Sequence, residues 1–250
     1  MVAIQLVSDL HIEAESTTID PLSVVTPSAP ILVLAGDIGS LYKLKNLENF
    51  LSALSKHYVA MFYIPGNHEY YTVPGIPPLT FDDLTKRLYS LEHTVPNLTI
   101  LDRQSAVIGN ACLVGCTLWS RPLVDIPKFI VRIHGMTTSR YRALHMRDVT
   151  YLQTMRQYCR DKGLRMVVVT HHSPTYSILS VRGNRPDPYI SLYASELDAL
   201  MSSPVQVWAC GHLHLNFDQK MHSGCRFVGN QRGKRKRQAT GYSPTKTLEI

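Results

Sequence analysis

The feature that most constrains the fold is a series of short apolar runs, each of which stops abruptly at glycine or at polar residues. Three of them, Ala3–Val7, Ile31–Ala35 and Val59–Ile64, lie in the first part of the chain. Before the third, the segment Leu44–Leu54 repeats leucine at steps of three and four, which predicts an amphipathic helix. Strands that are apolar on both faces and joined by helices are typical of buried, mostly parallel sheets, so we predict βαβ units here.

The middle of the chain has a different pattern. The runs Leu98–Leu101, Ala106–Ile108 and Cys112–Leu118 are separated by short turns, which predicts antiparallel hairpins and the start of a second sheet. No shift in composition marks a boundary, so residues 1–250 are predicted to form a single domain of the α/β (α+β) class. Beyond residue 118 we expect helices at Met146–Asp161 and Tyr193–Met201, and strands at Val167–Thr170, Val205–Ala209, Arg226–Val228 and Thr247–Ile250.

Composition argues against several classes of protein. The apolar runs are far shorter than the roughly 20 residues of a membrane-spanning helix, so no membrane partner is expected. The N-terminus reaches Asp9 without a basic leader, which argues against a secretory signal. The 5 cysteines form no CxxC pair, which argues against a disulfide framework and a thiolate zinc site and favours a cytoplasmic protein with reduced thiols.

The net charge of +7 comes mainly from one local run, because the rest of the chain is nearly balanced. This run consists of Arg232, Lys234, Arg235, Lys236 and Arg237. An exposed loop is its simplest interpretation. The run could also contact a nucleic acid or another polyanionic substrate, or act as a nuclear import signal.

Polar clusters follow the predicted strands at the points where these end. More than half of the 11 histidines lie in these clusters. Because loops at the carboxyl ends of parallel strands converge on one crevice, we expect the clusters to meet. The clusters are Asp9-Leu10-His11, Gly36-Asp37, Gly66-Asn67-His68-Glu69, His171-His172 and Gly211-His212-Leu213-His214.

The residue types and spacings in these clusters fit metal binding. In Asp9-x-His11 and His212-x-His214 the partners are two residues apart, so in extended chain both can face one ion. Carboxylate, imidazole and amide ligands suit Mn²⁺, Fe or Zn²⁺. There are more candidates than one tetrahedral ion uses, whereas two ions sharing a carboxylate would use them all. A single cluster could equally be a buried core histidine or chance, but together they favour a metal centre.

In this order the motifs Asp-x-His, Gly-Asp, Gly-Asn-His-Glu, His-His-x-Pro and Gly-His-x-His resemble the calcineurin-like metallophosphoesterases. They extend from residue 9 to residue 214, and the segments Asn230–Gly233 and Thr247–Ile250 are similar to small stand-alone members. The resemblance implies a four-layer αββα sandwich, in which two mixed β-sheets are flanked by helices. It also implies two divalent metal ions, with Mn²⁺ favoured and Fe or Zn²⁺ open.

The resemblance assigns a role to each matching position. Asp37 would bridge the two ions, and His68 would be catalytic without being a ligand. His172 is the alternative to His171. The remaining ligands would be Asp9, His11 and His214 for the first ion, and Asn67, His171 and His212 for the second.

The implied reaction is the hydrolysis of a phosphomonoester or phosphodiester. A metal-bridging hydroxide would attack phosphorus in line, while His68 assists the leaving group. One position departs from the family, since many members read Gly-Asp-x-x-Asp and use the second carboxylate to orient the catalytic histidine. Here Ser40 occupies that position. Another carboxylate, for which Glu69 is the candidate, would have to replace it.

Substrate contacts are less constrained by the sequence. Arg121 and Arg232 are candidate substrate-binding residues, and the segment from Arg121 to Arg142 also carries Arg132 and Arg140. A solvated loop is the alternative for this segment. Tyr70 and Tyr71 could stack on a substrate or pack within the loop. Two other functions stay open at this point: a nuclease or nucleotide phosphodiesterase that uses residues 232–237, and a catalytically weak interaction scaffold.

Overall fold

The apolar strands are buried on both faces because they lie in the middle of a layered structure. The computed structural model describes residues 2–15, 19–182, 188–234 and 237–250. In β2 (Ile31–Ala35), Leu32 and Leu34 pack toward the helices, whereas Val33 and Ala35 pack toward the second sheet. This alternation between two cores explains why the strand contains no polar residue.

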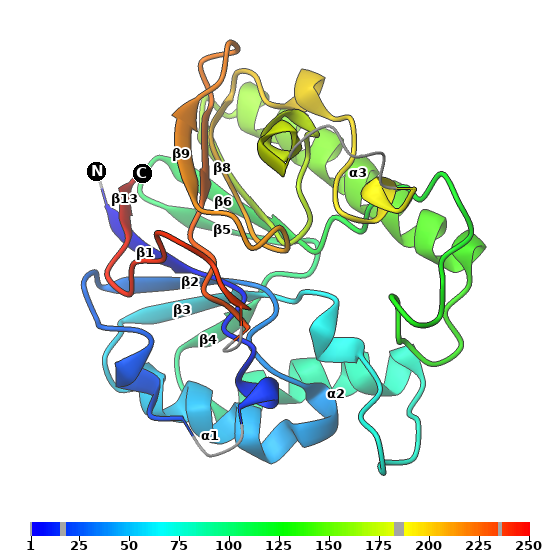
Figure 1. Cartoon of the computed structure of the whole chain (residues 1–250). Helices are drawn as coiled ribbons and strands as arrows, with labels where there is room; N and C mark the ends of the chain where they lie inside the picture. Colours follow the sequence, from blue (N-terminus) through cyan, green and yellow to red (C-terminus); the bar gives the residue numbers. More distant parts are fainter. Residues whose placement is uncertain (1, 16–18, 183–187, 235–236) are drawn as a thin grey trace.

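Two mixed sheets lie face to face, with helices on both outer sides (Figure 1). The first sheet has the order β13-β1-β2-β3-β4, in which only the edge strand β13 is antiparallel to its neighbour. The second has the order β5-β6-β7-β8-β10-β9, with antiparallel strands at both edges. The bounds are β1 Ala3–Val7, β3 Ala60–Ile64, β4 Leu98–Ile100, β5 Gln104–Ile108, β6 Ala111–Cys116, β7 Arg165–Thr170, β8 Val205–Cys210, β9 Phe217–Lys220, β10 Arg226–Gly229, β11 Gly233–Lys234, β12 Arg237–Gln238 and β13 Thr247–Glu249.

The helices form the two outer layers. The helix α1 (Leu44–Ser55) and the helix α2 (Phe81–Thr94) cover the first sheet, and α3 (Thr138–Asp161) covers the second (Figure 1). The predicted αββα sandwich of two mixed sheets is therefore confirmed. Short 3₁₀ helices fill the loops: Ile12–Ala14, Pro21–Ser23, Leu41–Lys43, His68–Tyr70, Ser177–Arg182, Ile190–Leu192 and Asp198–Leu200. In the described part of the chain, no helix is long and apolar enough to cross a membrane.

The structure corrects the predicted helices. The predicted helix at Tyr193–Met201 is wrong, because the backbone of Ser195 and Tyr193 pairs with Ser173 instead. The third helix begins at Thr138 rather than at Met146, and α2 was not predicted from the sequence.

Polar residues on the buried face of the third helix explain why its first turns were not predicted. Its first turns bury Tyr141, His145 and Asp148, which hides the apolar period that a sequence pattern relies on. The helix begins where the Thr137 side chain accepts a hydrogen bond from the Arg140 backbone.

Candidate metal centre

The predicted ligands sit on sharp turns at the carboxyl ends of strands from both sheets. The backbone of Asp9, His11, Asp37, His212 and His214 is left-handed, with φ between 49° and 68°. Such conformations are uncommon outside glycine and store strain at functional sites. The turns are locked together, since Asp9 N donates to Gly36 O at 2.9 Å and His11 N donates to Asp37 O at 2.9 Å. The strained turns aim several side chains at one volume.

The first cluster consists of Asp9 and His11 after β1, together with His214 after β8. The two Nε2 atoms of His11 and His214 are 3.0 Å apart, and His214 Nε2 is 3.3 Å from Asp9 Oδ1. His11 donates its Nδ1 proton to Glu13 Oε1 at 3.1 Å, so its Nε2 presents a lone pair to the cluster. Lone pairs that converge in this way suit a cation.

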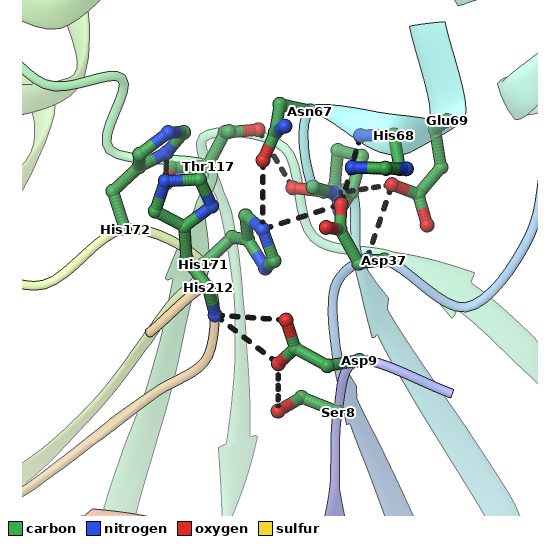
Figure 2. A network of polar contacts seen from close by, with 12 residues as sticks. Ser8, Asp9, Asp37, Asn67, His68, Glu69, Thr117, His171, His172 and His212 are labelled. Atoms are coloured by element: carbon green, nitrogen blue, oxygen red, sulfur yellow. Dashed lines mark hydrogen bonds and ion pairs between the residues drawn. The ribbon is translucent and has the colours of Figure 1, made fainter. Parts of the chain in front are cut away.

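The second cluster consists of Asp37, Asn67, His171 and His212 (Figure 2). His171 Nδ1 donates to Ala35 O at 2.9 Å, so its Nε2 is the ring nitrogen that faces the cluster. This nitrogen lies 3.0 Å from Asn67 Oδ1 and 3.2 Å from Asp37 Oδ1. Burial disfavours the charged imidazole, yet the Asp37 carboxylate raises the pKa of His171 to about 9. A divalent cation would compete with the proton on Nε2 for the lone pair of this nitrogen.

Asp37 lies between the two clusters. Its Oδ1 faces His171, whereas its Oδ2 is 3.7 Å from His11 Nε2. The backbone N–H of His68 donates to Oδ1 at 2.8 Å and holds the carboxylate in place. Burial opposes ionisation, but the neighbouring His171 and His68 hold the pKa of Asp37 well below its usual range. One carboxylate thus presents an oxygen to each cluster.

The clusters combine a buried ligand atom that has no partner with close packing against glycines. The buried Nε2 of His212 has no hydrogen-bond partner among the described residues. A Cβ atom on Gly66 would lie 2.3 Å from Asp37 Oδ1, and one on Gly211 would lie 2.7 Å from Asp9 Oδ2. The potential ligand atoms lie within 4.8 Å of one another in the triads Asp9–His11–His214 and Asp37–His171–His212, and in a third triad, His11–Asp37–His68, that overlaps both. The residues therefore fit a pair of divalent cations.

The order of these residues along the chain is matched by a known family. The sequence profile of the calcineurin-like phosphoesterases matches residues 4–216, which include every cluster described above. The chain belongs to the calcineurin-like phosphoesterase family. It is a metal-dependent phosphoesterase, as the strand-end motifs predicted.

Relatives of this calcineurin-like phosphoesterase are distant in sequence. The uncharacterized protein L509 of Acanthamoeba polyphaga mimivirus is 24% identical over 220 residues, covering 81% of this chain and 78% of that protein. The phosphopantetheinyl hydrolase of Mycobacterium tuberculosis has a similar fold, with a TM-score of 0.70 at 16% identity over 94% of this chain and 90% of that one. A dimetal phosphatase from Danio rerio gives a TM-score of 0.57 at 13% identity, over 96% and 90% respectively.

The carboxylate that faces His68 in this family member is Glu13. Glu13 Oε1 accepts from His68 Nδ1 at 3.3 Å and from His11 Nδ1 at 3.1 Å. Burial opposes the ionisation of Glu13, but these hydrogen bonds prevail and hold its pKa at about 2. Burial also lowers the pKa of His68, against the attraction of Asp37 and Glu13.

Glu69 does not replace the missing family carboxylate, so that expectation is wrong. Its oxygens accept from the backbone N–H groups of Asp37, Ile38 and Gly66 at 2.8–3.1 Å. It also accepts from the Tyr63 hydroxyl at 2.6 Å. Glu69 therefore fixes the loop that carries Asp37. The Ser40 hydroxyl accepts from the Tyr42 backbone and begins a 3₁₀ helix instead of facing His68.

A pocket of about 500 Å³ opens over the clusters. His68 and Tyr71 line it, and their rings are 4.4 Å apart. A second pocket of about 270 Å³ adjoins it and shares His68, Tyr71, Arg132 and Lys234. Phe129 also lines the larger pocket. This position was not predicted, because an isolated aromatic residue in a loop has no distinguishing sequence pattern. The remaining lining residues of the larger pocket are Asp37, Asn67, Ile130, Arg132, Tyr193, His212, Leu213, His214, Lys234 and Arg237.

Other predicted contacts lie elsewhere. Arg232 is 7% exposed, and its guanidinium donates to Leu10 O and to Glu15 Oε1, each at 2.9 Å. Arg121 lines a different pocket, beside His145. Substrate binding by these two arginines stays a prediction. Within the basic run, Arg235 and Lys236 lie outside the described residues.

The alternative ligand His172 points away from the cation clusters. Its Nε2 is 3.2 Å from the Tyr141 hydroxyl, and its Nδ1 is 3.4 Å from Thr117 O. Burial, reinforced by His171, lowers the pKa of His172 to about 3 and keeps the ring neutral. Both ring nitrogens thus have protein partners, and the geometry favours His171. Tyr70 is buried against Phe81 and packs within the core.

Proposed function

We propose that this phosphoesterase hydrolyses phosphate esters at two divalent cations bridged by Asp37. The observation that carries the proposal is the orientation of that carboxylate, whose two oxygens face His11 and His171 in different clusters. A carboxylate that served a single ion would not need both faces. The ligand set combines carboxylate and amide oxygens with imidazole nitrogens. We propose Mn²⁺ as the cation, with Fe and Zn²⁺ as the alternatives to test.

The remaining ligands would divide between the two cations as they divide between the two clusters. Asp9, His11 and His214 would hold one, and Asn67, His171 and His212 would hold the other. Bound in this way, the cations would neutralise the phosphoryl oxygens and lower the pKa of an attacking water. The protein contributes position and fixed charge, which phosphoryl transfer chiefly needs.

His68 is the residue that we propose to assist the leaving group. Its side chain is 13% exposed and lines the pocket beside Asp37 and Asn67. Glu13 accepts from its Nδ1, so Nε2 is the ring nitrogen left for a leaving oxygen. It would donate a proton from the doubly protonated ring, whose charge the Glu13 carboxylate would stabilise. Such general acid catalysis typically contributes about 10²–10⁴ in rate. His68→Ala should lower turnover by that order and keep the bound metal.

The test of the bridging role compares Asp37→Asn with Asp82→Asn, which removes an exposed carboxylate on α2. Protein stripped by a chelator is reloaded with Mn²⁺, Fe²⁺ or Zn²⁺, and the metal per chain is measured by mass spectrometry. We expect two ions per chain in the native protein and in Asp82→Asn. Asp37→Asn should bind less metal and lose about a hundredfold in turnover. Full activity and full loading of Asp37→Asn would disprove the bridging role.

The substrates in this test separate the reaction classes. Hydrolysis of p-nitrophenyl phosphate indicates a phosphomonoesterase, and hydrolysis of bis-p-nitrophenyl phosphate indicates a phosphodiesterase. Single-stranded RNA is the third substrate, because Lys234 and Arg237 of the basic run line the pocket. Preference for RNA over both small esters would favour the nuclease interpretation.

A further inference from the structure

Three cationic side chains line the pocket over the metal centre. Arg132, Lys234 and Arg237 line it, and none of them has an ion-pair partner among the described residues. Some basic side chains outside the pocket are paired, such as Arg140 with Asp82 at 2.8 Å, so it is the gathering of three cations in one concave site that distinguishes this set. Unpaired cations gathered in one concave site raise the local concentration of anions.

Arg132 is held in a defined place beside the catalytic histidine. Its guanidinium lies over the Tyr71 ring, 5.2 Å from the ring centroid, and that ring lies against His68. The segment is anchored, because Thr72 donates both its backbone N–H and its hydroxyl to Arg132 O, at 2.8 and 3.1 Å. The guanidinium therefore stands one aromatic ring away from His68.

Lys234 and Arg237 face each other across the small β11–β12 ribbon. They are direct partners in its antiparallel register. Like charges directly opposite each other on neighbouring strands are destabilising. An anion bound between them would remove that repulsion. The ribbon thus holds two cations in an arrangement that an anionic ligand would stabilise.

We infer that Arg132, Lys234 and Arg237 form a subsite for a second phosphate group of the substrate. The inference rests on the proposed function, because the metal centre would hold the phosphoryl group that is cleaved. The ligand class is a small organic diphosphate or bisphosphate, since a pocket of about 500 Å³ is of the size that small ligands occupy. Phe129, 74% exposed at the same pocket, offers apolar surface for the organic part.

The test compares two ligands that differ by one phosphate, AMP and ADP. Each competes with p-nitrophenyl phosphate for the Mn²⁺-loaded enzyme at constant free Mn²⁺, and each is also titrated by calorimetry. A phosphate held by arginine and lysine should make ADP bind about tenfold to a hundredfold more tightly than AMP. Arg132→Gln and Lys234→Gln should each bring the two affinities close to one another.

Arg140→Gln is the matched control, because the Arg140 guanidinium also lies 5.2 Å from a ring centroid, that of Phe81, but outside this pocket. It should keep the native preference for ADP. Equal binding of AMP and ADP by the native enzyme, or an unchanged preference in Arg132→Gln and Lys234→Gln, would overturn the subsite. Tighter, salt-dependent binding of single-stranded RNA with no preference for ADP would overturn it in favour of a nucleic acid.

The calorimetric arm keeps the two proposals separable. If p-nitrophenyl phosphate is not hydrolysed, the proposed function fails, yet the ratio of the two affinities still measures the subsite. If the ester is hydrolysed and the ratio is one, only the subsite fails.

Discussion

Replacing Glu13 by glutamine asks whether this carboxylate orients His68. Glu13 Oε1 accepts from His68 Nδ1 at 3.3 Å and from His11 Nδ1 at 3.1 Å. Its Oε2 is buried and has no hydrogen-bond partner among the described residues. Glutamine keeps the size of the side chain and one acceptor, and removes the negative charge. It also places an amide N–H₂ in a buried position that supplies no acceptor.

The size of the effect follows from the change of acceptor. A hydrogen bond to a charged group contributes about 1.5–3 kcal/mol, and a neutral one about 0.5–1.5 kcal/mol. The loss at His68 is therefore about 1–1.5 kcal/mol, with little screening because Glu13 is 14% and His68 13% exposed. If that energy is lost in the transition state, kcat falls about tenfold. The loss at His11 should weaken metal affinity, about tenfold to a hundredfold.

The assay measures kcat with p-nitrophenyl phosphate at saturating Mn²⁺, so that weaker metal binding does not limit the rate. Glu48→Gln, which removes a partly exposed carboxylate paired with Lys45, is the control and should behave as the native enzyme. A double-mutant cycle isolates the role of Glu13, because Glu13→Gln should cost almost nothing in a His68→Ala background. An undiminished tenfold loss in that background would refute the idea that Glu13 acts through His68.

Three further predictions concern the metal centre and the core. Gly66→Ala would place a Cβ atom 2.3 Å from Asp37 Oδ1, so metal per chain should fall and activity should drop at least about tenfold; mass spectrometry and turnover measure both. Removing metal with a chelator should lower the melting temperature, because Mn²⁺ at about 100 times its Kd stabilises the native state by about 2.7 kcal/mol. An unchanged melting temperature would contradict a metal site in the folded protein. Burial lowers the pKa of His145, so the neutral ring stabilises the fold above its unfolded pKa, and this contribution is lost as pH falls through the lower folded value. Between pH 7 and pH 5 the free energy of unfolding should therefore fall further in the metal-free native protein than in metal-free His145→Gln. An equal fall in the two proteins, measured by denaturant unfolding, would count against this.

The sequence was sufficient for most of the strands and for the convergence of the motifs. The hairpin predicted at Leu98–Leu101 is wrong, because β4 pairs in parallel with β3 in the first sheet, and β9 was not predicted. A strand such as Ile31–Ala35 is recognisable because it packs into two cores and is apolar throughout. The loops that carry Asp9 and Asp37 follow adjacent parallel strands, so their proximity follows from topology alone. Local pattern and chain direction determine these features.

The contacts around His68 could not be predicted from the sequence. Glu13 reaches His68 because the chain turns left-handed at His11 and enters a short 3₁₀ helix, and no residue pattern specifies that path. Glu69 looked suitable because it adjoins His68, yet adjacent side chains in a turn can point to different partners. Arg132 and Lys234 lie far apart in the chain, and only the tertiary structure shows that they share a pocket.

Each cation cluster draws its members from both β-sheets. Asp9 and Asp37 follow strands of the first sheet, whereas His171 and His214 follow strands of the second. Metal bound at either cluster would therefore cross-link the two halves of the sandwich at one end of their apolar interface. Metal affinity and the packing between the sheets are then thermodynamically coupled. A core substitution far from the ligands that separates the sheets should increase metal loss even where the catalytic groups are intact.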